Sequence, residues 1–112
     1  MAIVEITEEA LCNSSTSVSP PALQGVLIYT PFCGTCQLAE RMLEIVQAAG
    51  IAMPLRKLNI NYAPALREAW KVASVPCLAL LRNGAPIHME YTMKSVDHLY
   101  SLIRSHTAAA PD

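Results

Sequence analysis

The sequence predicts a single α/β domain, with a central mixed sheet of four to five strands and helices on both faces. Short apolar and β-branched runs alternate along the chain with helical patterns, which is typical of β-α-β units that form a parallel sheet. An Asn-Gly pair between two later runs predicts an antiparallel hairpin. The length of 112 residues leaves room for one core. We therefore expect residues 1–112 to form one unit.

Composition narrows the class of protein. Apolar residues make up 53% of the chain and charged residues 15%, which argues against disorder. The formal net charge is −1 and the sequence has no basic stripe, so nucleic-acid binding has little support. Its longest apolar runs, such as 77–81, are too short to span a bilayer. The acidic N-terminus does not resemble a secretory signal. We expect a cytoplasmic monomer with no nucleic-acid or membrane partner.

The first third of the chain begins with abbreviated elements. Residues 1–24 contain an expected strand (2–6), a short helix that Thr7 caps, and a loop rich in serine and proline (13–21). A buried strand is expected over 26–30, because its residues are β-branched and aromatic. A helix should follow it at once, since apolar residues recur there at helical spacing.

The middle of the chain predicts one strand and one helix. Residues 55–60 have the composition of a strand. Asn61 is a plausible cap for a helix over 62–71, in which Pro64 would occupy the first turn without losing a hydrogen bond. We expect this helix to return the chain to the sheet.

The last third predicts a hairpin and a final helix. Residues 76–82 are apolar throughout, as expected of a central strand covered on both faces. The turn Asn83-Gly84 joins them to a partner strand whose alternation over 87–92 gives it one wetter face. Ser95 can cap the last helix, and 107–112 is expected to be a flexible tail.

Two cysteines lie where the strand over 26–30 passes into the following helix. Cys33 and Cys36 are three positions apart, so they can form a disulfide with little backbone movement. The unpaired N–H groups and the positive end of the helix dipole favour a thiolate on the first cysteine. A thiolate attacks disulfides. The pattern predicts a thiol–disulfide oxidoreductase with Cys33 as nucleophile and Cys36 as resolving cysteine.

Other uses of the cysteines remain open at this point. A zinc site needs four ligands, and no second pair has ligand spacing; Cys12 and Cys77 would have to complete it, or the histidines His88, His98 and His106. A purely structural disulfide is a weaker alternative, because so short a loop removes little chain entropy. Cys12 and Cys77 are expected to be incidental thiols, with regulatory oxidation or dimer formation as the alternative.

Three stretches in fixed order resemble one known family. A hydrophobic strand runs into Cys-Gly-Thr-Cys over 26–36, a second strand follows over 56–61, and Val-Pro leads through a strand to Asn-Gly over 74–84. From Ile3 to about His106 the chain resembles the thioredoxin family. The resemblance implies a thioredoxin-like fold, reduction of protein disulfides and a role in cell redox homeostasis. It also implies an upstream reductant such as a thioredoxin reductase, and no metal or cofactor beyond the Cys33–Cys36 disulfide.

The same resemblance implies further site residues. The Val75–Pro76 bond would be cis, would face the cysteine motif and would present the Val75 backbone to an extended substrate segment. Within the motif Gly34 and Thr35 stand where thioredoxins usually carry Gly-Pro, and Phe32 stands where they usually carry tryptophan. These departures do not affect dithiol exchange by Cys33 and Cys36, but they affect which partner the protein binds.

One departure concerns proton transfer. Leu27 occupies the position of the family's buried acid, which is thought to assist the resolving cysteine. Cys36 is then expected to rely on Lys57 or on water. Lys57 matches the lysine beside that acid, and without an acidic partner it would favour a thiolate. Thr92 stands where a family glycine borders the substrate groove.

Two alternatives to protein-disulfide reduction are carried forward. The first is a glutaredoxin-like reduction of mixed disulfides, although the chain lacks a Gly-Gly-Asp-type turn before its last helix. The second is a metal-binding or interaction module that uses the same fold without turnover. Reactivity with glutathione mixed disulfides and metal analysis of the purified protein separate these possibilities.

Overall fold

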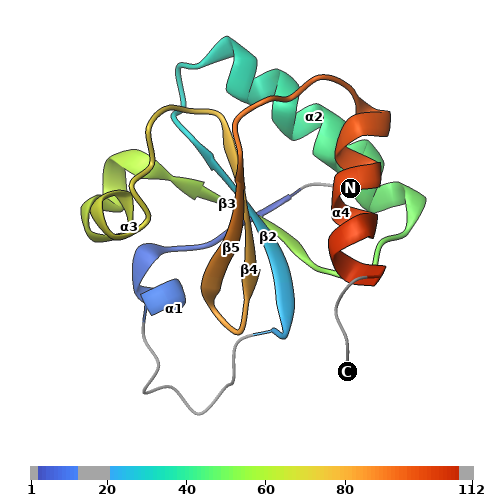
Figure 1. The fold of residues 1–112 in the computed structure, drawn as a ribbon. Helices are drawn as coiled ribbons and strands as arrows, with labels where there is room; N and C mark the ends of the chain where they lie inside the picture. The colour runs from blue at the N-terminus through green and yellow to red at the C-terminus, as the bar shows by residue number, and fades with distance from the viewer. Residues whose placement is uncertain (1–2, 13–20, 109–112) are drawn as a thin grey trace.

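The computed structural model describes residues 3–12 and 21–108, and its centre is a five-stranded sheet (Figure 1). The strands are β1 (Val4–Glu5), β2 (Leu23–Tyr29), β3 (Leu55–Asn59), β4 (Cys77–Arg82) and β5 (Ala85–Glu90). The α-helices are α1 (Glu8–Cys12), α2 (Gly34–Ala49), α3 (Pro64–Ala69) and α4 (Val96–Ala108), and a 3₁₀ helix, η1 (Ile60–Tyr62), precedes α3.

The sheet is mixed, as the sequence predicts. Its strand order is β1-β3-β2-β4-β5. Strand β3 pairs in parallel with β1 and with β2, whereas β4 runs antiparallel to both β2 and β5. Helices α2 and α4 lie on one face and α1 and α3 on the other (Figure 1). This architecture confirms the expected α/β fold with helices on both faces.

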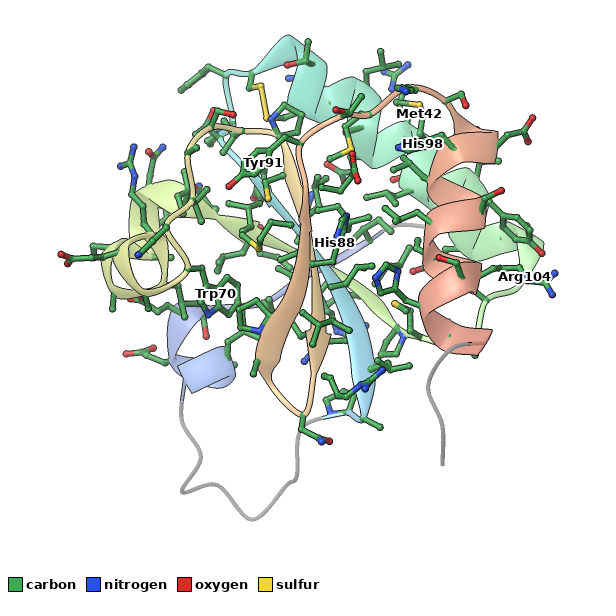
Figure 2. All side chains as sticks on the ribbon, viewed as in Figure 1. Met42, Trp70, His88, Tyr91, His98 and Arg104 are labelled. Carbon is green, nitrogen blue, oxygen red and sulfur yellow. A yellow bond between two sulfur atoms is a disulfide. The ribbon has the colours of Figure 1, made fainter. Side chains whose placement is uncertain are left out.

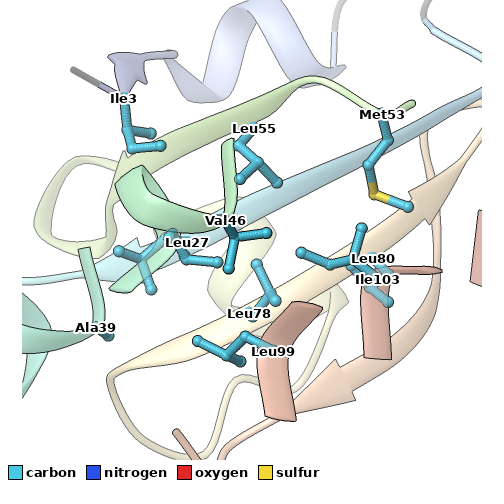
Figure 3. Packing of buried hydrophobic residues seen from close by; sticks show 11 residues of the cluster. Ile3, Leu27, Ala39, Val46, Met53, Leu55, Leu78, Leu80, Leu99 and Ile103 are labelled. Atoms are coloured by element: carbon cyan, nitrogen blue, oxygen red, sulfur yellow. The ribbon is translucent and has the colours of Figure 1, made fainter. Parts of the chain in front are cut away.

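The larger core lies between the sheet and helices α2 and α4 (Figure 3). Helix α2 contributes Ala39, Leu43 and Val46, and α4 contributes Leu99 and Ile103, all fully buried. These positions recur every three or four residues, so each helix presents one apolar stripe to the strands.

A second core lies under α1 and α3. Buried strand residues from β2, β3 and β4 meet Leu66 of α3 there, and Trp70 packs against the edge of the cluster, partly exposed. Trp70 is the only tryptophan in the sequence. Figure 2 shows it on the α1 and α3 side of the sheet.

The helix expected over 62–71 is present with Pro64 in its first turn, but it is shorter, spanning Pro64–Ala69, and Asn61 does not cap it. The Asn59 side chain instead accepts a hydrogen bond from the Asn61 backbone N–H at 3.0 Å and caps η1. The chain leaves this short helix at Ala63, and Pro64 then begins α3, which ends at Ala69. The Asn59 side chain, two residues before the expected cap, accepts the hydrogen bond from the backbone N–H that would otherwise lack a partner.

Other element ends differ from the sequence prediction in smaller ways. Strand β2 begins at Leu23, earlier than expected, because Leu23 and Gln24 pair with the far end of β4. Helix α4 reaches Ala108, so Thr107 and Ala108 belong to the helix and not to a tail. The expected loop over 13–21 lies outside the described residues except for its last position, as does the stretch after 108.

The Asn-Gly hairpin and the position of its second strand are confirmed. Asn83 and Gly84 have φ angles of 53° and 86°, the left-handed conformation that this tight turn requires. Strand β5 is an edge strand, which suits Pro86. Its polar side is not solvated as expected, however, because His88 and Glu90 face α4 and are partly buried. In the described part of the chain, no helix combines the length and apolar character needed to cross a membrane.

Candidate active site

The Cys33–Cys36 pair lies at the N-terminal end of α2, next to the end of β2. A disulfide joins the two residues, whose Cα atoms are 5.1 Å apart. Cys33 has an extended backbone and is the N-cap of the helix, and Cys36 lies in the first turn. The Cys36 side chain is 2% exposed, whereas Cys33 is half-buried. A partner arriving from solvent therefore meets the Cys33 sulfur.

Two groups surround the Cys33 sulfur in a way that favours negative charge. The Cys36 backbone N–H donates to Cys33 Sγ at 3.1 Å, as in an N-cap hydrogen bond. The Thr35 hydroxyl lies 3.3 Å from the same sulfur. The positive end of the α2 dipole adds to both effects. A thiolate formed at this atom is stabilised by its own helix.

The remaining motif positions are open to solvent. Phe32 is 101% exposed and stands beside the disulfide with no packing around its ring. Gly34 is exposed, and a Cβ atom built on it would have no neighbour within 4 Å. The structure thus shows no steric need for glycine at this position.

The Val75–Pro76 segment leads into β4 close to the motif. Its peptide bond is cis. Pro76 and Thr35 border the same groove, which places this segment opposite the cysteine motif. The Ala73 backbone N–H donates to the Tyr91 hydroxyl at 3.1 Å, so the loop before Pro76 is tied to the residue that follows β5.

The groove has a volume of about 270 Å³ and no charged side chain borders it. Figure 2 labels Met42 and Tyr91, two of the side chains around it. It is lined by Thr35, Leu38, Met42, Pro76, Tyr91 and Met93. Thr35 and Pro76 are among the predicted site residues, whereas Leu38, Met42, Tyr91 and Met93 were not predicted. Leu38 lies far from Tyr91 and Met93 in the sequence and only folding brings them together, so no local pattern marks them as one site.

Lys57 is not unpaired, contrary to the sequence prediction. Its ammonium group donates to Glu40 Oε2 at 2.9 Å, and each of the two side chains is 23% exposed. The same ammonium lies 5.4 Å from the centre of the Tyr29 ring. Tyr29 donates its hydroxyl proton to Glu5 at 2.7 Å. Burial and then this hydrogen bond raise the pKa of Tyr29 well above its usual range.

Cys77 is a free cysteine that is fully buried in the second core. Burial raises the pKa of its thiol to about 11, although Tyr91 acts in the opposite direction. This confirms the expected fate of Cys77 as a packed thiol. The Cys12 side chain is outside the described set, so its role stays a prediction.

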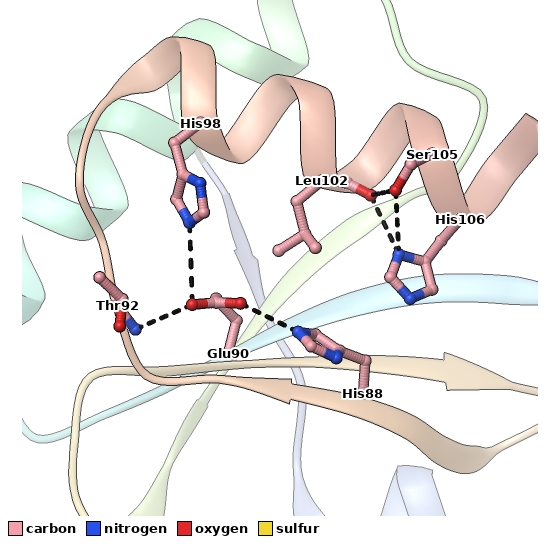
Figure 4. A network of polar contacts seen from close by, with 7 residues as sticks. All are labelled: His88, Glu90, Thr92, His98, Leu102, Ser105 and His106. Atoms are coloured by element: carbon pink, nitrogen blue, oxygen red, sulfur yellow. Dashed lines mark hydrogen bonds and ion pairs between the residues drawn. The ribbon is translucent and has the colours of Figure 1, made fainter.

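The histidines gather between β5 and α4 (Figure 4). Glu90 lies between His88, whose Nε2 is 2.9 Å from Oε1, and His98, whose Nε2 is 3.7 Å from Oε2. The hydrogen bond with His88 lowers the pKa of Glu90. The His106 ring is centred 5.2 Å from that of His88. Among the described residues, no three cysteine, histidine or acidic side chains are placed to hold a metal ion.

Comparisons of the sequence and of the structure with known proteins all match the same family. A sequence model of the family described as Thioredoxin matches residues 7–105. The thioredoxin-like protein YusE of Bacillus subtilis is 40% identical over 83 residues, which cover 74% of this chain and 78% of that protein. A thioredoxin of Chlamydia caviae is 30% identical over 70% of this chain and 78% of its own length. The structure of a mutant thioredoxin from Halobacterium salinarum superposes with a TM-score of 0.76, 25% identity, and coverage of 98% of this chain and 93% of that one.

Proposed function

Since this chain belongs to the thioredoxin family and is a thiol–disulfide oxidoreductase, we propose that it reduces disulfides in other proteins. Cys33 is the nucleophile and Cys36 the resolving cysteine. The observation that carries this assignment is the unequal environment of the two sulfur atoms. Cys33 Sγ is partly accessible and accepts the Cys36 N–H, whereas Cys36 is 2% exposed.

The reaction proceeds in two exchanges of sulfur–sulfur bonds. In the first, the Cys33 thiolate attacks one sulfur of the substrate disulfide, and the other sulfur leaves as a thiolate and is protonated. In the second, the Cys36 thiolate attacks Cys33 Sγ, and the first substrate sulfur leaves. Two electrons pass to the substrate, which becomes a dithiol, while the Cys33–Cys36 disulfide forms. This disulfide is the redox group of the protein.

Substrate positioning falls to the segment opposite the motif and to the groove. The Val75 backbone precedes a strand, so an extended segment of a partner can pair with it in the manner of strand addition. Pro76 and Thr35 border the groove beside this segment. Phe32 offers an exposed aromatic surface next to the disulfide. Gly34 keeps the outer side of the motif free of a side chain.

The cycle needs a reductant for the Cys33–Cys36 disulfide. We assign that part to an upstream dithiol donor such as a thioredoxin reductase, and we place the protein in the cytoplasm as a monomer. Membership of the thioredoxin family supports the reductant and the compartment, because thioredoxins in general work with a reductase and are mostly cytoplasmic.

The test is insulin reduction with single cysteine variants. We expect Cys33→Ser to abolish the activity, and Cys36→Ser to abolish turnover but accumulate a mixed disulfide that a thiol reductant releases. Cys12→Ser is the matched control and should retain activity. A Cys33→Ser variant that still reduces insulin would end the proposal. Faster reaction with a glutathione mixed disulfide than with insulin would replace it with the glutaredoxin-like function.

A further inference from the structure

The resolving step poses a problem that the disulfide exchange alone does not answer. Cys36 must lose its thiol proton before it can attack, yet its side chain is 2% exposed. Leu27 of β2, which is fully buried in the core beneath α2, has no group that could take the proton. A side chain that takes this proton must therefore come from a position other than Leu27.

Helix geometry points to Glu40. Residues four apart on an α-helix lie on the same side, with Cβ atoms about 5–6 Å apart. Glu40 follows Cys36 by four residues and therefore lies one turn along on the same flank. Thr35, Leu38 and Met42 are spaced by three and four residues, so they share one flank of α2, and this flank borders the groove. Cys36 and Glu40 are not part of this set.

The strand order shows which side of α2 each flank faces. Strands β3 and β4 lie on either side of β2. Glu40 reaches Lys57 of β3, whereas the groove includes Pro76 at the start of β4. Glu40 thus lies on the β3 side of α2, away from the groove beside the start of β4.

Lys57 fixes the carboxylate in this position. The bond of 2.9 Å engages Oε2, and a carboxylate offers about four lone-pair sites, so a proton can still be accepted. Lys57 pairs with Leu27 in the sheet register, directly below α2. The Tyr29 ring lies against the ammonium, and Tyr29 in turn donates to Glu5. Lys57 and Tyr29 therefore lie beside Glu40, Glu5 is hydrogen-bonded to Tyr29, and Glu44 stands one turn further along α2.

We propose that Glu40 accepts the thiol proton of Cys36 during the resolving step, with Lys57 as the positioning residue that holds its carboxylate. The proton moves from Cys36 Sγ to the Glu40 carboxylate, and the Cys36 thiolate attacks Cys33 Sγ. The bond between Cys33 and the substrate sulfur breaks, and the departing thiolate takes up the proton. This inference rests on the proposed roles of Cys33 and Cys36.

The test separates the two exchanges with DTNB, a small aromatic disulfide. Mixing it with reduced protein releases one coloured thiolate when Cys33 attacks and a second when Cys36 resolves the mixed disulfide. Every variant carries Cys12→Ser, so that the signal comes from the motif. We expect Glu40→Gln to slow the second phase at pH 7 by about tenfold to 100-fold and to change its pH dependence, with the first phase unaltered.

The controls distinguish this role from others. Glu44→Gln, one turn further along α2, should leave both phases unchanged. Lys57→Met should slow the second phase, and Lys57→Arg should restore it. If Glu40 acted only through its charge, Glu40→Gln would have the opposite effect on the rate of the second phase. Removing a negative charge near the Cys36 thiol favours its thiolate and speeds that phase. A second phase that is unchanged or faster in Glu40→Gln overturns the proposal, and so does equal slowing of both phases. Failure of the first phase in the parent protein would instead overturn the proposed function.

Discussion

Cys33 and Cys36 differ in exposure although only two residues separate them. Cys33 is the N-cap, where the chain has not yet entered the helix, and Cys36 is already on the stripe that α2 turns toward the sheet. Helix geometry therefore assigns one sulfur to the surface and the other to the interior. A local pattern of this kind is visible in the sequence, which is why both residues could be predicted.

Glu40 and Lys57 show the limit of such prediction. Lys57 was expected to lack an acidic partner, because no acid stands at the neighbouring strand position. The partner comes from α2, and only the parallel register between β2 and β3 brings the two together. Their separation of 17 residues carries no signal until the strand pairing is known.

Cys77 should be chemically inert in the native protein. Because burial raises the pKa of its thiol to about 11, only a minute fraction is thiolate at pH 7. We expect iodoacetamide to modify Cys77 only after unfolding, as measured by peptide mass mapping. Cys33 of the reduced protein provides the internal control and should react first. Modification of native Cys77 at a rate close to that of Cys33 would contradict the assignment of a packed thiol.

At the scale of the elements, Gly25 allows β2 and β3 to come together under the core. A Cβ atom at this position would lie 2.8 Å from Leu55 Cδ2 and 3.5 Å from side chains of two leucines in β4. Leu55 is buried and has little room to move. We expect Gly25→Ala to lower the free energy of unfolding by about 1–3 kcal/mol, measured by urea denaturation.

A matched control for this substitution lies in α2. Gly34→Ala introduces the same methyl group where no atom lies within 4 Å, so steric crowding should not destabilise it. Equal stabilities for Gly25→Ala and the parent protein would show that Leu55 and its neighbours adjust freely.

The contact between β5 and α4 makes stability depend on pH. The pKa of Glu90 is lowered from 4.5 in the folded protein, chiefly by the hydrogen bond with His88. Its contribution is therefore present above that ordinary value and is lost as the pH falls through the lower folded value. We expect Glu90→Gln to reduce the free energy of unfolding by about 1–2 kcal/mol at pH 7, and the difference to shrink in acid.

Denaturant unfolding at several pH values checks this expectation. Glu44→Gln serves as the control and should show no such pH-dependent difference. A Glu90→Gln effect of constant size from pH 7 to pH 2 would contradict a role for the ionised carboxylate. The sequence showed the alternation that places His88 and Glu90 on one side of β5, but it assigned that side to water because the alternation does not reveal that α4 folds back over this strand.

At the scale of the whole molecule, the order of elements was predictable and several of their ends were not. Apolar runs and turn residues are local properties, so the mixed sheet and both helical layers followed from the sequence. The start of β2 and the interruption between η1 and α3 depend on distant pairing and on one asparagine side chain. The ends of these elements are determined by hydrogen bonds and strand pairing and not by the local preference of the residues for helix or strand.

The position of Trp70 predicts how tryptophan fluorescence responds to reduction of the disulfide and to unfolding. Trp70 lies in the α1 and α3 layer (Figure 2), on the face of the sheet opposite to α2, which carries the disulfide at its start. We expect tryptophan emission to stay constant when the disulfide is reduced and to change in one cooperative step on unfolding. Phe32→Trp is the comparison, because an indole beside the disulfide should respond to reduction. A redox-dependent emission in the parent chain would contradict the separation.

Helix α2 has the groove on one flank and the Glu40–Lys57 pair on the other. The residues that border the groove and the residues of the ion pair can therefore be substituted independently. With the roles proposed above, exchange of Leu38 and Met42 is expected to alter the choice of target and to leave the Glu40–Lys57 pair on the other flank unchanged. The two flanks would then let the choice of target and the rate of the resolving step be altered by separate substitutions.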